Sequence, residues 1–478
     1  MKASSNRHGR GAAARPEEPR RRQQELSRLR DLVVSPLNAI ARFSKDKRGA
    51  SAMIVAITLP VLIGFGSLGA ETGLWYKIKR QSQSAADAAA LSAAYEVIAG
   101  KTNLTSNLTP AASEAATQNG YTGTAPLVVH PYSDSIVKNG VAVTLQQTQP
   151  GLLASLFLPS VTIATKAVAV IKVLDNPCIL ALGTTGIDVN VIAASSLYVP
   201  TCSVAANSTS SSSIAIQSST GSITATTLVT RGEVSFNGNP INPAAPPPEF
   251  ALTSRPLIGV PSIADPYASR LTHAFLTSGM PTTGTCTQTG TTYSGRCVIA
   301  GTLLKSGTWT LSPSTPGMQI SGGLTVNGAV TLSPGTYWIT DGPLDLQANA
   351  LLKCTSCTII LTKGIAGILG NVQISSGTTV TLQAPNSGTF SGLLLIQDPV
   401  TTPSVTSVLD GGGNMKLTGL LYLPNTTVGF HGNPSATCTV LITQQVAINV
   451  GNSTFTTSGC KKAGLTRLPA VNTVALAE

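Results

Sequence analysis

Residues 324–346 read LTVNGAVTLSPGTYWITDGPLDL, and the same sequence pattern continues through most of the chain after Cys178. Short runs of Val, Ile, Leu and Thr alternate with turns that are rich in Gly, Ser, Asn and Pro. Similar runs occur at 359–361 (IIL), 372–374 (VQI) and 380–382 (VTL). Short strands that recur without helices between them are typical of a β-sandwich, a barrel or a solenoid. The stretch therefore predicts a mainly β fold.

The composition favours one of these β architectures. Charged residues make up 11% of the 478 positions, against about 25% in an average globular domain. Abundant Thr, Ser and Asn suit a β-helix-like solenoid, in which polar side chains form ladders along the axis. A β-sandwich is the alternative. No strict sequence repeat is visible, so the number of coils stays open.

The β-rich region divides into segments of different composition. Residues 178–240 form a first β-rich half, and residues 301–462 form a second, solenoid-like half. Between them, residues 241–300 are expected to be a Pro-rich linker and an insertion, because 237–250 (NGNPINPAAPPPEF) holds five prolines, which stiffen the backbone. Residues 463–478 are expected to be a C-terminal tail.

An uncharged apolar segment precedes the β-rich region. The 21 residues from Ala50 to Ala70 read ASAMIVAITLPVLIGFGSLGA. About 20 helical residues span the roughly 30 Å hydrocarbon core of a bilayer. The segment is long for a cleaved signal peptide, and it lacks a clear small-x-small cleavage site. It therefore predicts a single transmembrane helix with the lipid bilayer as a partner.

The positive charge is concentrated before this segment. The formal net charge is +11, of which residues 1–48 hold 13 basic and 5 acidic residues, or +8. A block of this kind is typical of a solvated, disordered tail. An excess of Lys and Arg on one side favours the cytoplasm for that side. We therefore expect a basic cytoplasmic tail and no nucleic-acid partner.

An Ala-rich helix is predicted after the span, so that residues 49–100 form one transmembrane and Ala-rich helical unit. Residues 77–99 read KIKRQSQSAADAAALSAAYEVIA, and Ala is the best helix former. The stretch of about residues 45–96 resembles the N-terminal domain of TadG-like proteins, which belong to the tight-adherence (Flp pilus) assembly group of bacteria. The residues that carry the resemblance are Gly49, Pro60, Glu71, Gln83, Ala86, Asp87 and Ala90.

The resemblance implies a function and a location. It implies a membrane-anchored envelope protein that takes part in pilus assembly or adherence. Such a protein lies in the bacterial inner membrane with its C-terminal domain in the periplasm or outside the cell. The expected partners are other pilus-assembly or envelope proteins, with self-association through the transmembrane or β-rich region as a further possibility. The D-x-S-x-S metal motif that many relatives carry in a further domain does not occur.

Two smaller segments connect the helix to the β-rich region. Residues 101–120 are polar and are expected to be a linker. Residues 121–175 are expected to be a small α/β unit of βαβ type. Its strands would lie at 141–145 and 161–173, with a short helix at 150–157.

The cysteines indicate an oxidising compartment, because an even number is confined to the region after the span. Pairing by sequence proximity gives four disulfides among the 105 possible arrangements. The C-x-x-C pair at 354 and 357 precedes a strand-like run, which favours a structural disulfide over zinc or redox chemistry. The eight candidates are Cys178, Cys202, Cys286, Cys297, Cys354, Cys357, Cys438 and Cys460.

The sequence offers no catalytic, cofactor-binding or metal-binding residue set. The histidines are isolated, and familiar hydrolase, zinc-protease and P-loop motifs do not occur. Asp341 and Asp345 are the closest carboxylate pair in the β-rich part, and a turn and an exposed strand position explain them better than acid-base catalysis. We therefore expect a non-enzymatic protein without a cofactor. The alternative is a polysaccharide-lyase-like enzyme or a glycan-binding adhesin on a β-helix.

Overall fold

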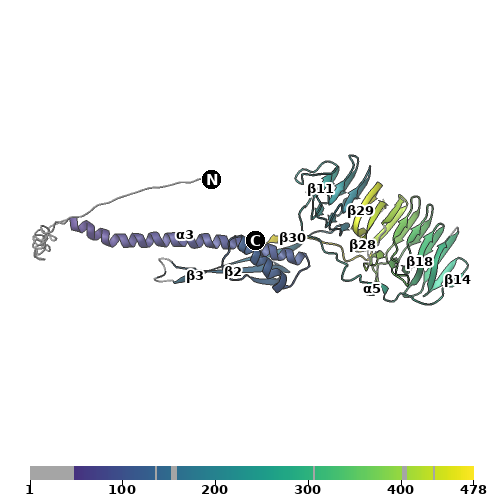
Figure 1. Ribbon diagram of the computed structural model, residues 1–478, viewed down its shortest axis with the longest axis horizontal. Coiled ribbons are helices and arrows are strands. Elements are labelled where there is room, and N and C mark those ends of the chain that lie inside the picture. The colour runs from purple at the N-terminus through teal and green to yellow at the C-terminus, as the bar shows by residue number, and fades with distance from the viewer. Residues whose placement is uncertain are drawn as a thin grey trace, which may run out of the picture. The chain divides into compact units, whose positions relative to one another are not determined.

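A computed structural model describes residues 48–134, 137–151, 155, 159–304, 307–400, 406–433 and 437–477 (Figure 1). The chain divides into two compact units, residues 1–78 with 148–162, and residues 79–147 with 163–478. The expected disordered tail lies outside the described residues apart from Arg48.

Helix α3 (Arg48–Ile98) contains the apolar segment and the Ala-rich segment in one continuous run of 51 residues. Among the described residues it is the one helix that is long and apolar enough to cross a bilayer. Its apolar side chains are exposed, as Phe65 shows with 74% of its surface accessible. Pro60 lies inside the helix and lacks the N–H that would bond to the carbonyl of Ala56.

The polar segment after α3 is helical, so the expectation of a linker at 101–120 is wrong. A π-helical turn η1 (Leu104–Leu108) leads into helix α4 (Thr109–Gln118). The Asn103 side chain accepts hydrogen bonds from the backbone N–H groups of Thr105 and Ser106, both at 3.0 Å. A capping Asn and a proline in the first turn are helix-start signals that the polar composition concealed.

A four-stranded sheet follows, in the order β1-β2-β3-β30. Strands β1 (Leu127–Tyr132) and β2 (Gly140–Pro150) pair antiparallel. Strand β2 neighbours β3 (Ser160–Asp175), and only residues 151–159 separate them. A parallel βαβ crossover needs about a dozen residues or more. The βαβ expectation is therefore wrong, and most of the helix expected at 150–157 lies outside the described residues.

The expected C-terminal tail contains a strand instead. Strand β30 (Val471–Leu476) pairs antiparallel with β3, in a register that runs from Val173 opposite Asn472 to Ala169 opposite Leu476. The chain leaves the small sheet at the end of β3 and returns to it almost 300 residues later. The sequence VNTVAL gave no sign of this, because its partner strand is so distant along the chain. The whole β-rich region is thus inserted between two neighbouring strands.

This inserted region is built from many short strands in two runs. The first run comprises β4 (Ile179–Ala181), β5 (Val189–Val191), β6 (Ser196–Val199), β7 (Val204–Ala206), β8 (Ile214–Ile216), β9 (Ser222–Ala225), β10 (Leu228–Thr230), β11 (Val234–Phe236), β12 (Asn239–Pro240) and β13 (Phe250–Leu252). The second run comprises β14 (Thr287–Thr289), β15 (Thr292–Gly295), β16 (Val298–Leu304), β17 (Thr308–Pro313), β18 (Met318–Val326), β19 (Ala329–Leu332), β20 (Gly335–Thr340), β21 (Leu344–Leu346), β22 (Leu351–Cys354), β23 (Cys357–Thr362), β24 (Val372–Ile374), β25 (Thr379–Gln383), β26 (Leu393–Gln397), β27 (Ser407–Gly412), β28 (Met415–Gly432) and β29 (Thr439–Thr454).

Apart from β12 and β14, which pair antiparallel with β11 and β15, these strands stack into three parallel columns. In the first run the columns are β4-β7-β10, β5-β8-β11 and β6-β9-β13. In the second run, column one is β16-β18-β20-β23-β26-β28. The long strands β16, β18, β28 and β29 turn a corner and serve two columns. Parallel pairing from coil to coil confirms the solenoid expectation over the sandwich.

The two runs join in the middle of the stack. Strand β29 pairs in parallel with β4, β5 and β6, with Leu441 opposite Ile179 and Val446 opposite Val189. Figure 1 shows this yellow strand near the blue-green strands of the first run. The chain thus enters at the middle, winds to one end, crosses to the other end through residues 253–297, and winds back. Relative to a solenoid threaded from end to end, this order is circularly permuted.

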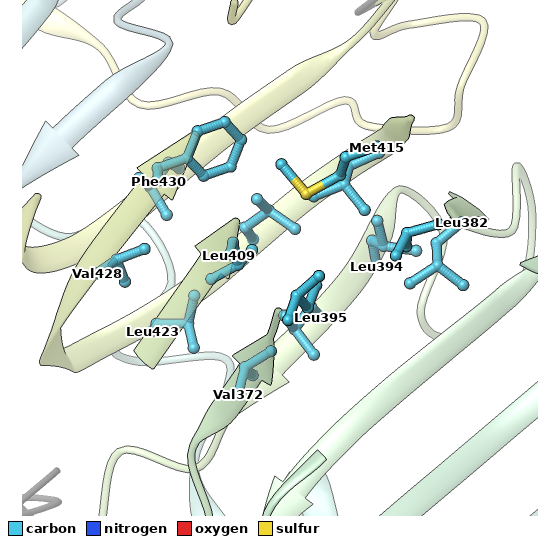
Figure 2. Packing of buried hydrophobic residues seen from close by; sticks show 14 of the residues in the cluster. Val372, Leu382, Leu394, Leu395, Leu409, Met415, Leu423, Val428 and Phe430 are labelled. Atoms are coloured by element: carbon cyan, nitrogen blue, oxygen red, sulfur yellow. The ribbon is translucent and has the colours of Figure 1, made fainter. Parts of the chain in front are cut away.

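The solenoid interior is filled by alternate residues of each strand. Leu409 of β27 and Met415, Leu423, Val428 and Phe430 of the long strand β28 point into a shared interior (Figure 2). Each of them is at most 1% exposed. Burying one such side chain is worth about 1.5–3 kcal/mol, so the stacked coils supply the main stabilisation of the fold.

Elements outside the regular coils pack against both ends of the solenoid and protect strand edges there. At one end Phe236 and Ile241, which flank the start of the Pro-rich segment, pack on the core, and Phe236 meets Phe250 edge-on with ring centroids 6.4 Å apart. At the other end the antiparallel β14-β15 hairpin stacks Tyr293 on Trp309 at 5.7 Å. The Pro-rich segment therefore begins as a cap.

The crossing segment, residues 253–297, covers the outer face of column one. Its residues Ile263, Tyr267 and Leu276 belong to a second hydrophobic core together with outward-facing strand residues. Trp338 of β20 donates its indole N–H to the carbonyl of Leu276 at 2.7 Å. Asn207 both donates to and accepts from the backbone of Ile263, at 2.9 and 2.7 Å. These contacts bind the segment along several coils, and we call it the strap.

A buried carboxyl group lies beside the junction of the two runs. Asp188 Oδ2 accepts the backbone N–H groups of Asn207 and Ser208 at 3.0 and 2.8 Å. Its Oδ1 has no hydrogen-bond partner among the described residues. Burial raises the pKa of Asp188 to about 7, although these two hydrogen bonds oppose the shift.

We predict that Asp188→Asn reduces the pH dependence of stability between pH 5 and 8. A carboxyl whose pKa is raised in the folded state contributes stability that is fully present below about 4 and is lost as pH rises through about 7. The amide does not titrate, so the thermal unfolding midpoint of the variant falls less over this range. Circular dichroism of the full-length protein measures it. Asp345→Asn, at a half-exposed strand position, is the control, and parallel wild-type and Asp188→Asn curves would contradict the prediction.

Candidate functional site

The C-terminal part of α3 packs on the small sheet through alanines. Their side chains end at Cβ, so the helix backbone approaches the sheet closely without displacing neighbours. Opposite them lie Val141, Val143 and Leu145 of β2. The buried alanines, all 0% exposed, are Ala85, Ala86, Ala89, Ala90, Ala93 and Ala94.

Two polar residues at the edge of this alanine face connect the helix to the sheet. Gln83 donates through its side-chain amide to Asp87 Oδ1 at 2.9 Å, one helical turn away. The same amide donates to the carbonyl of Lys166 on β3 at 3.2 Å. Gln83 and Asp87 therefore set the position of the helix against β3 and also line a groove.

The groove has a volume of about 460 Å³ and is bordered by α3, β3, the β1–β2 connection and the end of β30. Lys166 Nζ donates to the Tyr132 hydroxyl at 2.9 Å and lies 4.2 Å from the centroid of that ring. The Tyr132 hydroxyl donates in turn to Asp134 Oδ2 at 3.1 Å. Carboxylates and one ammonium group thus line one open surface.

The groove carries no arrangement for metal binding. Among the described residues, no group of three or more His, Cys, Asp or Glu side chains is placed to hold a metal ion. The polar groups of the groove engage one another, as the Lys166, Tyr132 and Asp134 contacts show.

The remaining residues of the expected motif lie on α3. Gly49 and the segment from Ala50 to Ala70 belong to the helix, as does Pro60. Glu71 is only 4% exposed, directly after a stretch of exposed apolar side chains.

Comparison with known proteins agrees with this helix. Residues 49–96 match the family model described as putative Flp pilus-assembly TadE/G-like. These residues are therefore similar to that family, and we refer to them as the TadE/G-like segment. The match ends within α3, so it covers neither the small sheet nor the solenoid. No curated protein and no solved structure matches the chain.

All eight cysteines lie outside the TadE/G-like segment. They form four disulfide pairs, each between cysteines that are neighbours in the sequence. Cys178 lies 5.7 Å from Cys202, Cys286 lies 4.9 Å from Cys297, Cys354 lies 6.1 Å from Cys357 and Cys438 lies 4.8 Å from Cys460, all between Cα atoms. The C-x-x-C pair joins the end of β22 to the start of β23, and both side chains face the solenoid core. This position in a strand corner differs from the helix start that redox catalysis uses.

Two histidines that are isolated in the sequence meet aspartates in the structure. His273 Nδ1 lies 2.5 Å from Asp398 Oδ2, which also accepts the Thr362 hydroxyl at 2.6 Å. His431 Nδ1 lies 2.5 Å from Asp410 Oδ1. The first pair connects the strap to strands of column one, so it fastens the strap.

Asp341 and Asp345 do not act as a pair. Asp341 accepts the backbone N–H groups of Gly364, Ala366 and Ile368, at 3.0 to 3.1 Å, and so holds a loop of the next coil. Asp345 Oδ2 instead accepts the side-chain amide of Gln347 at 2.6 Å. Their separate contacts agree with the turn and strand interpretation of these residues.

Sequence reasoning missed the groove residues outside the TadE/G-like segment. Tyr132 and Asp134 come from the end of β1 and the residues just after it, Lys166 comes from β3, and Leu476 and Ala477 come from the C-terminal region.

We predict that Ala86→Leu destabilises the small domain by about 1–3 kcal/mol, the usual cost of overpacking a close contact. Ala86 is 0% exposed against the sheet. Ser84→Leu, on the exposed side of the same helix, is the control and should change stability little. Limited proteolysis of the full-length protein in nanodiscs, followed within residues 121–175, measures the difference. Equal protease resistance of both variants would contradict the packing argument.

Proposed function

We propose that this protein is a non-enzymatic, single-pass component of the bacterial inner membrane that takes part in the assembly of a Flp-type pilus or in adherence through it. The TadE/G-like match over residues 49–96 is the observation that carries this proposal. Ala50 to Ala70 would form the membrane span, and the rest of α3 would connect this span to the small domain.

The distribution of charge supports the proposed orientation. The +8 carried by residues 1–48 favours a cytoplasmic N-terminus by the positive-inside rule. The small sheet and the solenoid then lie in the periplasm or outside the cell. The four cysteine pairs support this location, because disulfides persist in oxidising compartments.

The proposed partners are the lipid bilayer and other pilus-assembly or envelope proteins. The groove offers them a polar surface to which the TadE/G-like segment contributes Gln83 and Asp87. Self-association through α3 or through the solenoid is a further route to an assembly. The return of β30 to the small sheet joins both ends of the solenoid insertion to the anchored domain.

The enzyme alternative has less support. A polysaccharide-lyase-like enzyme on a β-helix needs carboxylates and basic groups that converge on one face of the solenoid. The solenoid aspartates Asp341, Asp345, Asp398 and Asp410 instead engage separate local partners. We therefore place the enzyme second.

We predict that deletion of the protein reduces surface piliation and adherence at least severalfold, and that the wild-type chain restores both. Electron microscopy and a surface-adherence assay measure the two effects. Crosslinking in the intact envelope should recover pilus-assembly proteins with the wild type.

A second test uses a chain that carries Gln83→Ala and Asp87→Ala. These substitutions remove the side-chain amide of Gln83 and the carboxylate of Asp87 from the groove but leave the alanine face of α3 intact. Reduced recovery of partners with unchanged membrane insertion is the expected result. Normal pili and adherence in the deletion strain, with no pilus protein crosslinked, would refute the proposed function.

A further inference from the structure

A second groove, of about 580 Å³, runs along one corner of the solenoid between the strap and the coils. One wall is Phe275 of the short strap helix α5 (His273–Thr277) together with Ser278. The other wall is made by the turns that lead into four successive strands of column one, β18, β20, β23 and β26. Its volume lies within the range of about 300–1,000 Å³ that is usual for small-ligand sites.

The groove carries two half-buried aromatic rings. Phe275 and Phe390 meet edge-on with centroids 5.7 Å apart, one from each wall. Trp338 closes the floor and is 1% exposed. Rings with an accessible apolar face are the side chains on which the C–H faces of a pyranose can pack.

Hydroxyl groups line the rest of the groove. None of them has a hydrogen-bond partner among the described residues, so all remain available to a ligand. They come from every one of the four turns and from the strap. The six are Ser278, Thr315, Thr336, Ser356, Ser387 and Thr389.

The lining contains no charged side chain. Arg270 is close by, but its guanidinium donates to the carbonyl of Thr389 at 3.2 Å and is not part of the lining. An uncharged surface of free hydroxyls and aromatic rings disfavours an anionic ligand, whose desolvated charge would lack a partner.

The periodicity suits a linear polymer of similar units. The four turns are in register, since Met318 lies opposite Tyr337, and Ile359 lies opposite both Tyr337 and Leu395. Neighbouring parallel strands are about 4.8 Å apart, close to the length of one pyranose unit. Each coil can therefore present its hydroxyl to successive residues of a chain that lies along the solenoid axis.

A proline-rich peptide fits less well. Grooves that bind such peptides combine aromatic faces with donors for the peptide carbonyls. Here the indole N–H of Trp338 is already bonded to Leu276. Pro316, Pro334 and Pro385 occupy turns of the wall and have no N–H to donate.

We propose that this corner groove binds an uncharged oligosaccharide, with Phe275 and Phe390 packing on sugar faces and the turn hydroxyls bonding sugar hydroxyls. The site belongs to the solenoid and goes beyond the proposed role in pilus assembly. It would give the exposed part of the protein a direct contact with neutral envelope or surface glycans.

The test uses the full-length protein in phospholipid nanodiscs, because alkyl glycoside detergents would themselves compete for a sugar site. Isothermal titration calorimetry with cellopentaose, chitopentaose and maltopentaose should give saturable binding to at least one of them. Phe275→Leu and Phe390→Leu keep apolar bulk but remove the ring, and each should weaken that binding about tenfold or more. Phe236→Leu is the matched control, since Phe236 is also half-buried and edge-on to another Phe, but lies at the capped end of the solenoid.

A further variant, Thr336→Val, removes one groove hydroxyl with almost no change of shape and should weaken binding severalfold. It keeps the test decisive if a Phe variant unfolds. The proposal is overturned if none of the three sugars binds, if the Phe and Thr variants bind as the wild type does, or if an oligogalacturonate or a proline-rich decapeptide binds more tightly. Sugar binding in vitro is measured independently of piliation. A deletion strain with normal pili would therefore refute the proposed role in pilus assembly without refuting the sugar-binding site.

Discussion

The parallel pairing of β29 with β4, β5 and β6 is the constraint on which the rest of the structure depends. Leu441 donates its backbone N–H to Cys178 at 2.7 Å, and Leu182 donates to Thr443 at 2.8 Å. These bonds join coils that are more than 250 residues apart along the chain. Without them the solenoid would be two short stacks, each with an open strand edge in the middle of the domain.

Closing the stack in its middle has consequences for the rest of the chain. Because the first and last coils are neighbours, the chain enters and leaves the solenoid at the same level, and β30 can return to β3. The strap must then run between the two ends, which places it over the outer face of column one. The corner groove exists because α5 of the strap lies beside the turns of four coils. Its ligand surface is thus a product of the circularly permuted order.

Much of the architecture is readable from local sequence. Val, Ile and Leu runs separated by Gly, Ser and Asn turns predicted a β-solenoid, because alternate residues of each strand fill its interior. The QSAADAAAL run predicted the Ala-rich helix and the resemblance that the family match bears out. Errors arose where a partner lies far away. Strand β30 resembled a tail because only β3 makes it a strand, and the helices at 104–118 were concealed by polar residues that cap them.

The sequence by itself determined the apolar span, the distribution of charge and the mainly β character, because these depend on composition and on near neighbours. Only the tertiary structure decided the junction of β29 with β4, the pairing of β30 with β3 and the placement of His273 beside Asp398. The same holds for the groove that combines Gln83, Lys166 and Leu476. Each of these contacts joins residues more than 80 positions apart. Backbone hydrogen bonding and burial select such partners by shape and register, which no local pattern records.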